Sequence, residues 1–433
     1  PTEPARLAAT AHVVSLQRKQ GVSPSWSFVR RIRDQAMGVP SPQTGTAGLF
    51  PVSGGQVFVA ALRVNDFDYA TVVDTGSSDP WLANDNFTCS DPVSEETIPP
   101  ELCFFGPTYN PSESSTFEPV PDEFFRVGYA SGETLTGQLG LETVELGGIQ
   151  VTEQKFGVVD RAAWYGDGVS SGLIGLASYF LTSAFSGNDP TVFAQDTRQP
   201  YDPIFVNMFQ RFGVPAVFSM VLTRDTPQLE LGGLLGLGGV PVVPHTPGFA
   251  SAPIRIFGVN EEGESVYQFY EIPSEGFAVS ASRSTQFNPH NTTNPAKQNL
   301  MGNGTHVIID SGTSLVYLPD DVTEAVHAAY QPPAQFDDQT GFYTVDCEAT
   351  APVVGVQIGK KIFYINFADL VLPIDSLRSK CISGVQPSFG GLTILGDVWM
   401  KGVLSVFDIQ SIQMQFAARK YYGLEEEPVV PTT

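Results

Sequence analysis

Two short runs of the sequence each join an aspartate to a glycine and hydroxyl side chains. The first runs from Val72 to Ser78 with the sequence VVDTGSS, and the second runs from Ile308 to Ser314 with the sequence IIDSGTS. In both, an apolar strand ends in an aspartate that begins a tight turn. Average composition would produce two such aspartate motifs in one chain only on the order of once in a few thousand cases. The repetition predicts two similar lobes, each presenting one aspartate.

Asp74 and Asp310 have a definite chemistry if the two lobes bring them together. Two carboxylates held close together cannot both ionise cheaply, so the pair keeps one proton over a wide acidic range. The ionised member can take a proton from a water molecule while the protonated member donates to a carbonyl oxygen. This predicts direct hydrolysis of an amide by water. A single such motif is more often an Asx-turn at a strand end, but two matching copies favour the catalytic interpretation.

The small residues around the aspartates have supporting roles in this interpretation. Glycine lets the backbone approach closely, and the hydroxyls of Ser77 and Thr313 can donate hydrogen bonds that orient the carboxylates. The predicted supporting residues are Thr75, Gly76, Ser77, Ser311, Gly312 and Thr313.

The elements that must carry these turns are mainly β-strands. Segments rich in Val, Ile, Phe and Thr alternate with clusters of Gly, Pro, Asn and Asp, and 42 Gly and 34 Pro leave little room for long helices. The pattern predicts an all-β fold with sandwich or barrel-like lobes. Expected strands include 56–64, 70–73, 134–146, 216–222, 306–309 and 404–407, and expected short helices are 203–212 and 320–330.

Composition narrows the class of protein. A chain of 433 residues with 42% hydrophobic and 16% charged residues can bury a large core. The net charge of -23 argues against a nucleic-acid partner, because a phosphate backbone recruits Lys and Arg. No apolar run approaches the roughly 20 residues that span a bilayer, so no membrane partner is expected.

Cysteine usage points to an oxidising compartment. The four cysteines form an early pair, Cys89 and Cys103, and a late pair, Cys347 and Cys381. Their spacing matches no zinc ribbon or redox motif, and the five histidines are scattered, so neither a metal nor a cofactor is expected. Two disulfides, one in each half, are the simplest interpretation. Three N-glycosylation sequons point the same way, at Asn86, Asn291 and Asn303.

The first residues form a basic leader on an acidic body. Ser23 and Pro24 are typical of a helix start, an apolar stripe follows, and Gly38 ends it. A linker rich in Pro, Gly and Thr comes next, and exposed linkers are where proteases cut. We therefore interpret residues 1–45 as a removable inhibitory prosegment, with a new terminus expected between Gly38 and Phe50. A solubilising tail remains the alternative.

From about residue 50 to 423 the chain resembles the pepsin-like aspartic proteases, especially secreted fungal ones. The run from Asp74 to Trp81 is similar to the first catalytic motif of that family, and Asp310 to Ser314 is similar to the second. Further landmarks follow in the family's order. They are the stretches 109–117, 127–137, 171–177, 393–399 and 406–408.

The resemblance implies a bilobal fold with two pseudo-symmetric barrel-like lobes, a cleft between them and a β-hairpin flap. The implied organisation is a propeptide over 1–45, an N-terminal lobe over 46–222 and a C-terminal lobe over 223–433. In the flap and cleft it places Tyr129, Ser131, Gly132 and Trp81, with Trp81 hydrogen-bonded to Tyr129. It pairs Cys347 with Cys381 and puts a loop disulfide at Cys89 and Cys103. It also implies that the segment 14–19 is the opening strand of the propeptide and that a downstream basic residue, which could be Arg30, Arg31 or Arg33, covers the dyad.

Taken together, these features predict an acid endopeptidase acting on proteins or peptides. The chain is expected to be a monomer made as an acid-activated zymogen, inhibited by its own propeptide, and secreted, with the vacuole as the second choice. Departures from the family include Ala130, Ser131 and Glu133 in the flap, and they favour cleavage between bulky apolar residues with little activity after lysine. Glu133 could reverse that preference. Asp79-Pro80 is expected to change only the local turn.

Two alternatives from other classes remain open. A catalytically silent binding protein could share the fold, although such proteins usually have an altered catalytic position and none is altered here. A glycosidase could also use paired carboxylates, but it would not explain the repeated motif or the flap.

Overall fold

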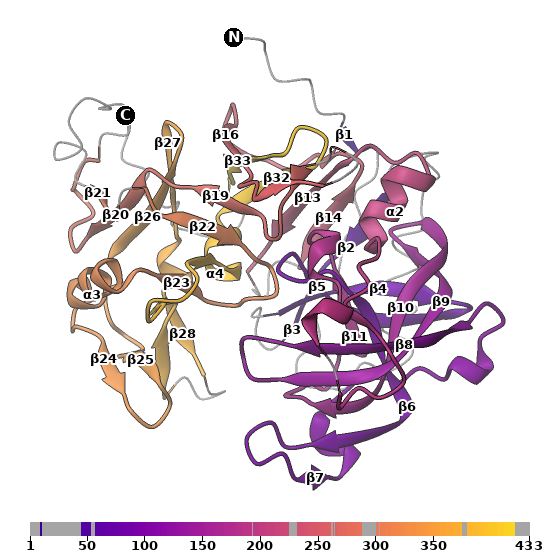
Figure 1. Cartoon of the computed structure of the whole chain (residues 1–433). Helices are drawn as coiled ribbons and strands as arrows, with labels where there is room; N and C mark the ends of the chain where they lie inside the picture. The colour runs from indigo at the N-terminus through magenta and orange to yellow at the C-terminus, as the bar shows by residue number, and fades with distance from the viewer. Residues whose placement is uncertain are drawn as a thin grey trace. The chain divides into compact units, whose positions relative to one another are not determined.

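The computed structural model describes residues 9–10, 45–52, 57–192, 194–224, 232–260, 263, 265–287, 300–302, 304–374 and 379–420. The chain forms two compact units, each held together by its own internal contacts (Figure 1). Unit 1 comprises Pro1–Val242 with Phe257–Phe269, and unit 2 comprises Val243–Ile256 with Tyr270–Thr433. The first change of unit, between Val242 and Val243, lies further along the chain than the predicted lobe boundary at residue 222. The expected leader helix, the segment 14–19 and the three arginines lie outside the described residues.

Unit 1 is built on a sheet that closes on itself. The strand order is β12-β8-β9-β10-β6-β11-β5-β4-β3, and an additional β9–β4 pairing joins the sheet into a barrel. Its main strands are β3 (Phe50–Val52), β4 (Val57–Val64), β5 (Phe67–Asp74), β6 (Pro80–Ser90), β8 (Glu118–Gly128), β9 (Thr134–Leu146), β10 (Ile149–Ala163), β11 (Gly172–Gly175) and β12 (Ala184–Ser186). Nearly all of β5 is buried, as expected for a strand covered on both faces.

Smaller elements complete unit 1. Strand β7 (Thr97–Ile98) pairs with β6, and β17 (Gly258–Val259) pairs with β18 (Ser265–Val266). An antiparallel group contains β2 (Gly45–Gly48), β13 (Val217–Leu222) and β14 (Gly233–Leu237), and β1 (Ala9–Thr10) runs parallel to β15 (Val240–Pro241). Helix α2 covers Ile204–Arg211.

Unit 2 consists of smaller sheets. Its strands include β16 (Ala250–Pro253), β19 (Glu271–Pro273), β20 (Gly276–Ser280), β21 (Leu300–Met301), β22 (His306–Ile309), β23 (Val316–Leu318), β24 (Gln335–Asp337), β25 (Phe342–Val345), β26 (Val353–Ile358), β27 (Lys361–Tyr364), β28 (Val371–Pro373), β29 (Cys381–Ser383), β30 (Val385–Pro387), β31 (Ile394–Leu395), β32 (Val403–Asp408) and β33 (Gln413–Ala418). The sheet β19-β22-β31-β23-β30 carries the second aspartate motif. Helices α3 (Asp320–Ala329) and α4 (Asp397–Met400) lie in this unit.

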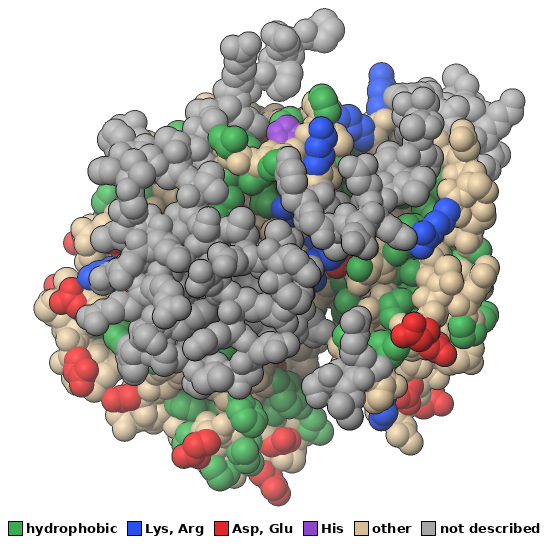
Figure 2. Space-filling view, turned by 180° about the vertical axis from the view of Figure 1, so that it is seen from behind, with side chains coloured by type: hydrophobic (Ala, Val, Ile, Leu, Met, Phe, Trp, Pro, Cys, Tyr) green, Lys and Arg blue, Asp and Glu red, His purple; other side chains and the backbone are tan. Residues whose placement is uncertain are grey.

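The all-β prediction is confirmed. The described residues contain many strands and only short helices, and the expected strands and helices appear within a few residues of their predicted bounds. No helix in the described part of the chain is long and apolar enough to cross a membrane. Among the described residues on the face drawn in Figure 2, acidic side chains lie in several separate groups.

Candidate active site

The first aspartate ends strand β5 in unit 1. Asp74 is 6% exposed, and its two carboxylate oxygens have different partners. The backbone N–H of Gly76 donates to Oδ1 at 2.7 Å, and the hydroxyl of Ser77 donates to Oδ2 at 2.5 Å. Because one donor holds each oxygen, this turn fixes the plane of the Asp74 carboxyl group.

The second aspartate repeats this arrangement in unit 2. Asp310 directly follows β22, the backbone N–H of Gly312 donates to its Oδ1 at 2.8 Å, and the hydroxyl of Thr313 donates to its Oδ2 at 2.6 Å. The roles predicted for Ser77 and Thr313 as donors to the carboxylates therefore have the required geometry in each unit.

A strand supports each aspartate loop, and a glycine stands at its end in unit 1 and directly after it in unit 2. In unit 1, β11 runs parallel to β5 and antiparallel to β6, and in unit 2, β31 runs parallel to β22 and antiparallel to β23. A Cβ atom added at Gly175 or at Gly396 would collide with the backbone of the adjacent aspartate loop, near Ser78 and Thr313 respectively. Only glycine permits this close backbone approach.

The β8–β9 hairpin carries Tyr129 at its turn. The indole N–H of Trp81 donates to the Tyr129 hydroxyl at 2.9 Å, which is the hydrogen bond that the resemblance implied. Burial, and then the negative charge of Asp74, raises the pKa of Tyr129 well above its ordinary value of 10.0. The phenol therefore keeps its proton and can still donate it to a hydrogen-bond acceptor. Gly132, in the same turn, has a φ of 93°, which favours glycine.

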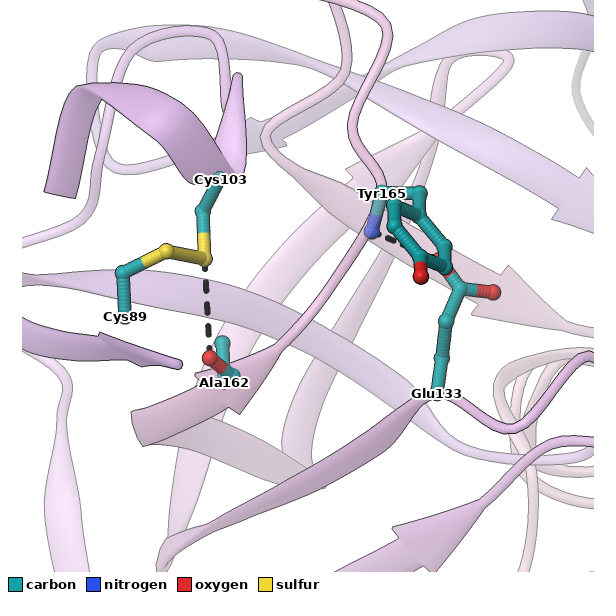
Figure 3. The surroundings of a disulfide bond; sticks show 5 residues. All are labelled: Cys89, Cys103, Glu133, Ala162 and Tyr165. Carbon is teal, nitrogen blue, oxygen red and sulfur yellow. Dashed lines mark hydrogen bonds between the residues drawn. A yellow bond between two sulfur atoms is a disulfide. The ribbon is translucent and has the colours of Figure 1, made fainter. Parts of the chain in front are cut away.

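Glu133 and Ser131 interact with each other in this turn. The Ser131 hydroxyl donates to Glu133 Oε2 at 2.6 Å, and the backbone N–H of Tyr165 donates to Glu133 Oε1 at 2.9 Å (Figure 3). Burial raises the pKa of the Glu133 carboxyl. Both oxygens of the side chain are therefore engaged within unit 1.

The expectation that Asp79 affects only the local turn is wrong. Asp79 is 1% exposed, and its Oδ1 accepts hydrogen bonds from the backbone N–H of Ser183 at 2.7 Å and from the hydroxyl of Tyr201 at 2.6 Å. These partners are distant in sequence, which is why the motif alone did not reveal them. Burial raises the pKa of the Asp79 carboxyl.

Both disulfides implied by the sequence are present. Cys89 is bonded to Cys103 in unit 1, and Cys347 is bonded to Cys381 in unit 2. Asn86 is exposed on β6, whereas Asn291 and Asn303 lie outside the described residues. Across the described ranges, no three His, Cys, Asp or Glu side chains gather in a way that could hold a metal ion.

Comparison with known proteins identifies the family. The model of the eukaryotic aspartyl protease family matches residues 64–419. A probable aspartic-type endopeptidase of Aspergillus fumigatus is 39% identical over 87% of this chain and 82% of its own length. Penicillopepsin-1 of Talaromyces stipitatus is 24% identical over 93% of this chain and 90% of its own length.

The fold has a solved counterpart. The crystal structure of an aspartic proteinase from Irpex lacteus matches with a TM-score of 0.63 and 19% identity, covering 88% of this chain and 98% of that one. The likeness agrees with a bilobal all-β fold. The motifs, the two matching aspartate loops and these relatives lead to one conclusion: the chain belongs to the eukaryotic aspartyl protease family and is an aspartic-type endopeptidase.

Proposed function

We propose that Asp74 and Asp310 form one catalytic dyad that hydrolyses internal peptide bonds of proteins at acidic pH. The observation that carries this proposal is the matching pair of aspartate loops. In each unit a glycine N–H holds one carboxylate oxygen and a hydroxyl side chain holds the other, at distances that agree within about 0.1 Å. Two loops with the same donors present their carboxylates in the same way, as a symmetric dyad requires.

The proposed reaction uses water as the nucleophile. One carboxyl of the pair retains a proton, and the ionised partner accepts a proton from a bound water molecule as that water attacks the peptide carbonyl carbon. The protonated carboxyl donates to the carbonyl oxygen. Proton transfer to the amide nitrogen then breaks the C–N bond and releases an amine and a carboxylic acid. Ser77 and Thr313 keep the carboxylates oriented throughout.

In this proposal the flap turn lies over bound substrate. Tyr129, held by Trp81, is the flap tyrosine, and Ser131 and Gly132 contact the substrate beside it. We propose a preference for bulky apolar residues on both sides of the cut, with little cleavage after lysine. The contacts of Glu133 support this weak cleavage after lysine. Both of its carboxyl oxygens are already engaged within unit 1, one by Ser131 and one by Tyr165. A peptide library in which lysine is the favoured residue before the cut would contradict the preference.

We also propose that the leader, residues 1 to about 45, is the propeptide of a zymogen. Within the leader, β1 runs parallel to β15, so one part of it pairs with the body. By contrast, β2 is buried and pairs with β14, which makes Gly45–Gly48 part of the body. The activating cut is therefore expected between Gly38 and Gly45. N-terminal sequencing after acid incubation tests this, and a new terminus beyond Gly48 would contradict it.

We further propose that the protein is secreted and that it is a monomer. Two disulfides suit an oxidising compartment, and the Asn86 sequon is exposed and accessible to glycosylation. Detection of the glycosylated enzyme in the culture medium would support secretion, and its retention in the vacuole would contradict it. A single-chain mass in solution would support the monomer.

The activity itself has a direct test. The acid-activated chain is incubated with an acid-denatured globular protein at about pH 3 to 4, with and without a statine-type inhibitor. Proteolysis that the inhibitor blocks is the expected result. Inhibitor binding without proteolysis would instead indicate a silent binding protein.

A further inference from the structure

The flap turn, residues 129–133, has an attachment that the proposed chemistry does not use. The antiparallel ladder between β9 and β10 ends at the pair Thr134 and Ala163. Beyond it, the backbone N–H of Tyr165 has no strand partner within that ladder and instead donates to Glu133 Oε1. The Glu133 side chain thus extends the ladder by one hydrogen bond.

A second contact joins the same two segments. The Tyr129 ring lies 5.8 Å from the Trp164 ring in an edge-to-face arrangement, and Trp164 also packs against Trp81 at 5.4 Å. The segment 164–168, here called the support segment, therefore contacts the flap turn through two neighbouring residues. One contact holds the flap tyrosine, and the other holds Glu133.

The support segment itself rests on a covalently closed loop. The backbone N–H of Gly168 donates to the Phe104 carbonyl oxygen at 2.7 Å, and a Cβ at Gly166 would collide with the carbonyl oxygens of Cys103 and Phe104. Cys103 Sγ lies 3.5 Å from the Ala162 carbonyl oxygen (Figure 3). This is a packing contact, because a disulfide sulfur has no hydrogen to donate. The Cys89–Cys103 bond thus fixes the loop on which the support segment lies.

From these contacts we propose that Glu133 is a positioning residue for the proposed protease site. Its carboxylate attaches the flap turn to the support segment, which the disulfide-closed loop holds in place, and this attachment sets the position of Tyr129. The inference rests on the proposed function, in which Tyr129 lies over the substrate.

Two variants test the attachment. Glu133→Ala removes both acceptors, while Glu133→Gln keeps an amide oxygen that can accept from the Tyr165 N–H. Glu118→Ala is the matched control, since Glu118 is an exposed glutamate on strand β8 of the same hairpin. Steady-state kinetics use a fluorogenic peptide spanning the bond that the wild-type enzyme cuts fastest in an acid-denatured globular protein.

Loss of the hydrogen bond from the Tyr165 N–H is expected to lower kcat/KM of Glu133→Ala by about tenfold, mainly through a higher KM. Glu133→Gln is expected to stay within about threefold of wild type, and Glu118→Ala is expected to match wild type. In the contrary outcome, the thermal unfolding midpoint of Glu133→Ala falls while its KM and kcat stay unchanged. That result would show that Glu133 has only a structural role, and it would overturn the inference.

Amide hydrogen exchange separates this inference from the proposed function. Without substrate, exchange at Tyr165 and in the flap turn is expected to be about tenfold faster in Glu133→Ala than in wild type, with β4 and β5 unchanged. Equal exchange rates in the two proteins would overturn the attachment even if the enzyme is active. A wild-type chain without acid proteolysis would overturn the proposed function, while the exchange experiment would still decide whether Glu133 holds the turn.

Discussion

The two aspartate loops are alike where they hold the carboxylates and unlike immediately afterwards. Both use a glycine N–H and a hydroxyl side chain as donors. Five residues after the aspartate, however, unit 1 has the buried carboxyl of Asp79, whereas unit 2 has Leu315. The repeated part is the geometry that chemistry would require. The residues that follow the repeated part differ between the units. One unit has a buried carboxyl at this position, and the other has an apolar side chain.

The two units also differ in how burial shifts the pKa of titratable groups. In unit 1, burial raises the carboxyl pKa of Asp79 and of Glu133, so the folded state favours their protonated forms. In unit 2, burial lowers the pKa of His327 to about 4, so the folded state favours the neutral ring. The contributions of Asp79 and Glu133 to stability should therefore respond to acid with the opposite sign to that of His327.

The largest expected effect tests whether the two loops are equivalent in function. Asp74→Asn and Asp310→Asn each remove one of the two proposed proton-transfer groups, so each should lower kcat by about 10²- to 10⁴-fold. The losses should be of similar size because the two carboxylates have the same donors. Initial rates on an acid-denatured globular protein measure this, and activity retained by one variant alone would show that the loops are not equivalent.

Substitution of the supporting glycines should be the next largest effect. Gly175→Ala and Gly396→Ala each force a Cβ against the adjacent aspartate loop and should destabilise the protein by about 3 kcal/mol. Denaturant unfolding measures the loss. Gly148→Ala is the control without a steric collision, because no atom lies within 4 Å of an added Cβ at Gly148. The φ of 82° at Gly148 imposes backbone strain of its own. A similar loss in all three variants would argue against the proposed collision.

His327→Gln should change how stability responds to acid. The His327 Nε2 lies 2.8 Å from the Val385 carbonyl oxygen, and a glutamine amide can provide a similar donor. Because the folded-state pKa is lowered from 6.5 to about 4, stability from the neutral ring is complete above pH 6.5 and is lost as pH falls toward 4.

The wild-type chain should therefore lose about 2 kcal/mol more than the His327→Gln variant between these two pH values. Chemical unfolding at both pH values measures the difference. Parallel losses in the two proteins would show that His327 does not titrate in this way.

Asp79→Asn should give the smallest effect, with the opposite sign. The raised pKa means that the carboxyl's stabilising contribution is complete below its unfolded value of 3.8 and is lost as pH rises through the folded value. An asparagine keeps Oδ1 as an acceptor for Ser183 and Tyr201 and does not ionise. The variant should match wild type in stability near pH 3 and be more stable than wild type at pH 7.

Asp91→Asn is the control for Asp79→Asn. Asp91 is partly exposed, and the backbone N–H of Ser94 lowers its pKa, so removing its charge should not stabilise the protein at pH 7. A gain of similar size in both variants would indicate a general effect of net charge instead of the burial of Asp79.

Sequence patterns predicted the parts of the molecule that are local. The aspartate turns follow from a few adjacent residues, and the strands and the two disulfide pairs followed from composition, spacing and family resemblance. Asp79 was misjudged because its partner Tyr201 is 122 residues away and reaches it only through the fold. The Glu133 attachment depends on where the β9–β10 ladder ends, and the change of unit at Val242–Val243 depends on packing, neither of which a motif encodes.

Comparison of Asp74→Asn, Asp310→Asn and the double variant tests the dyad most directly. Two groups that act as one unit are strongly non-additive, so the double variant should be no slower than the slower single variant. The assay measures proteolysis of an acid-denatured globular protein by the activated chain, with the background that persists in the presence of the inhibitor subtracted. Equal residual rates in all three variants are the predicted result. Losses that multiply in the double variant would show that Asp74 and Asp310 act separately and would contradict the dyad.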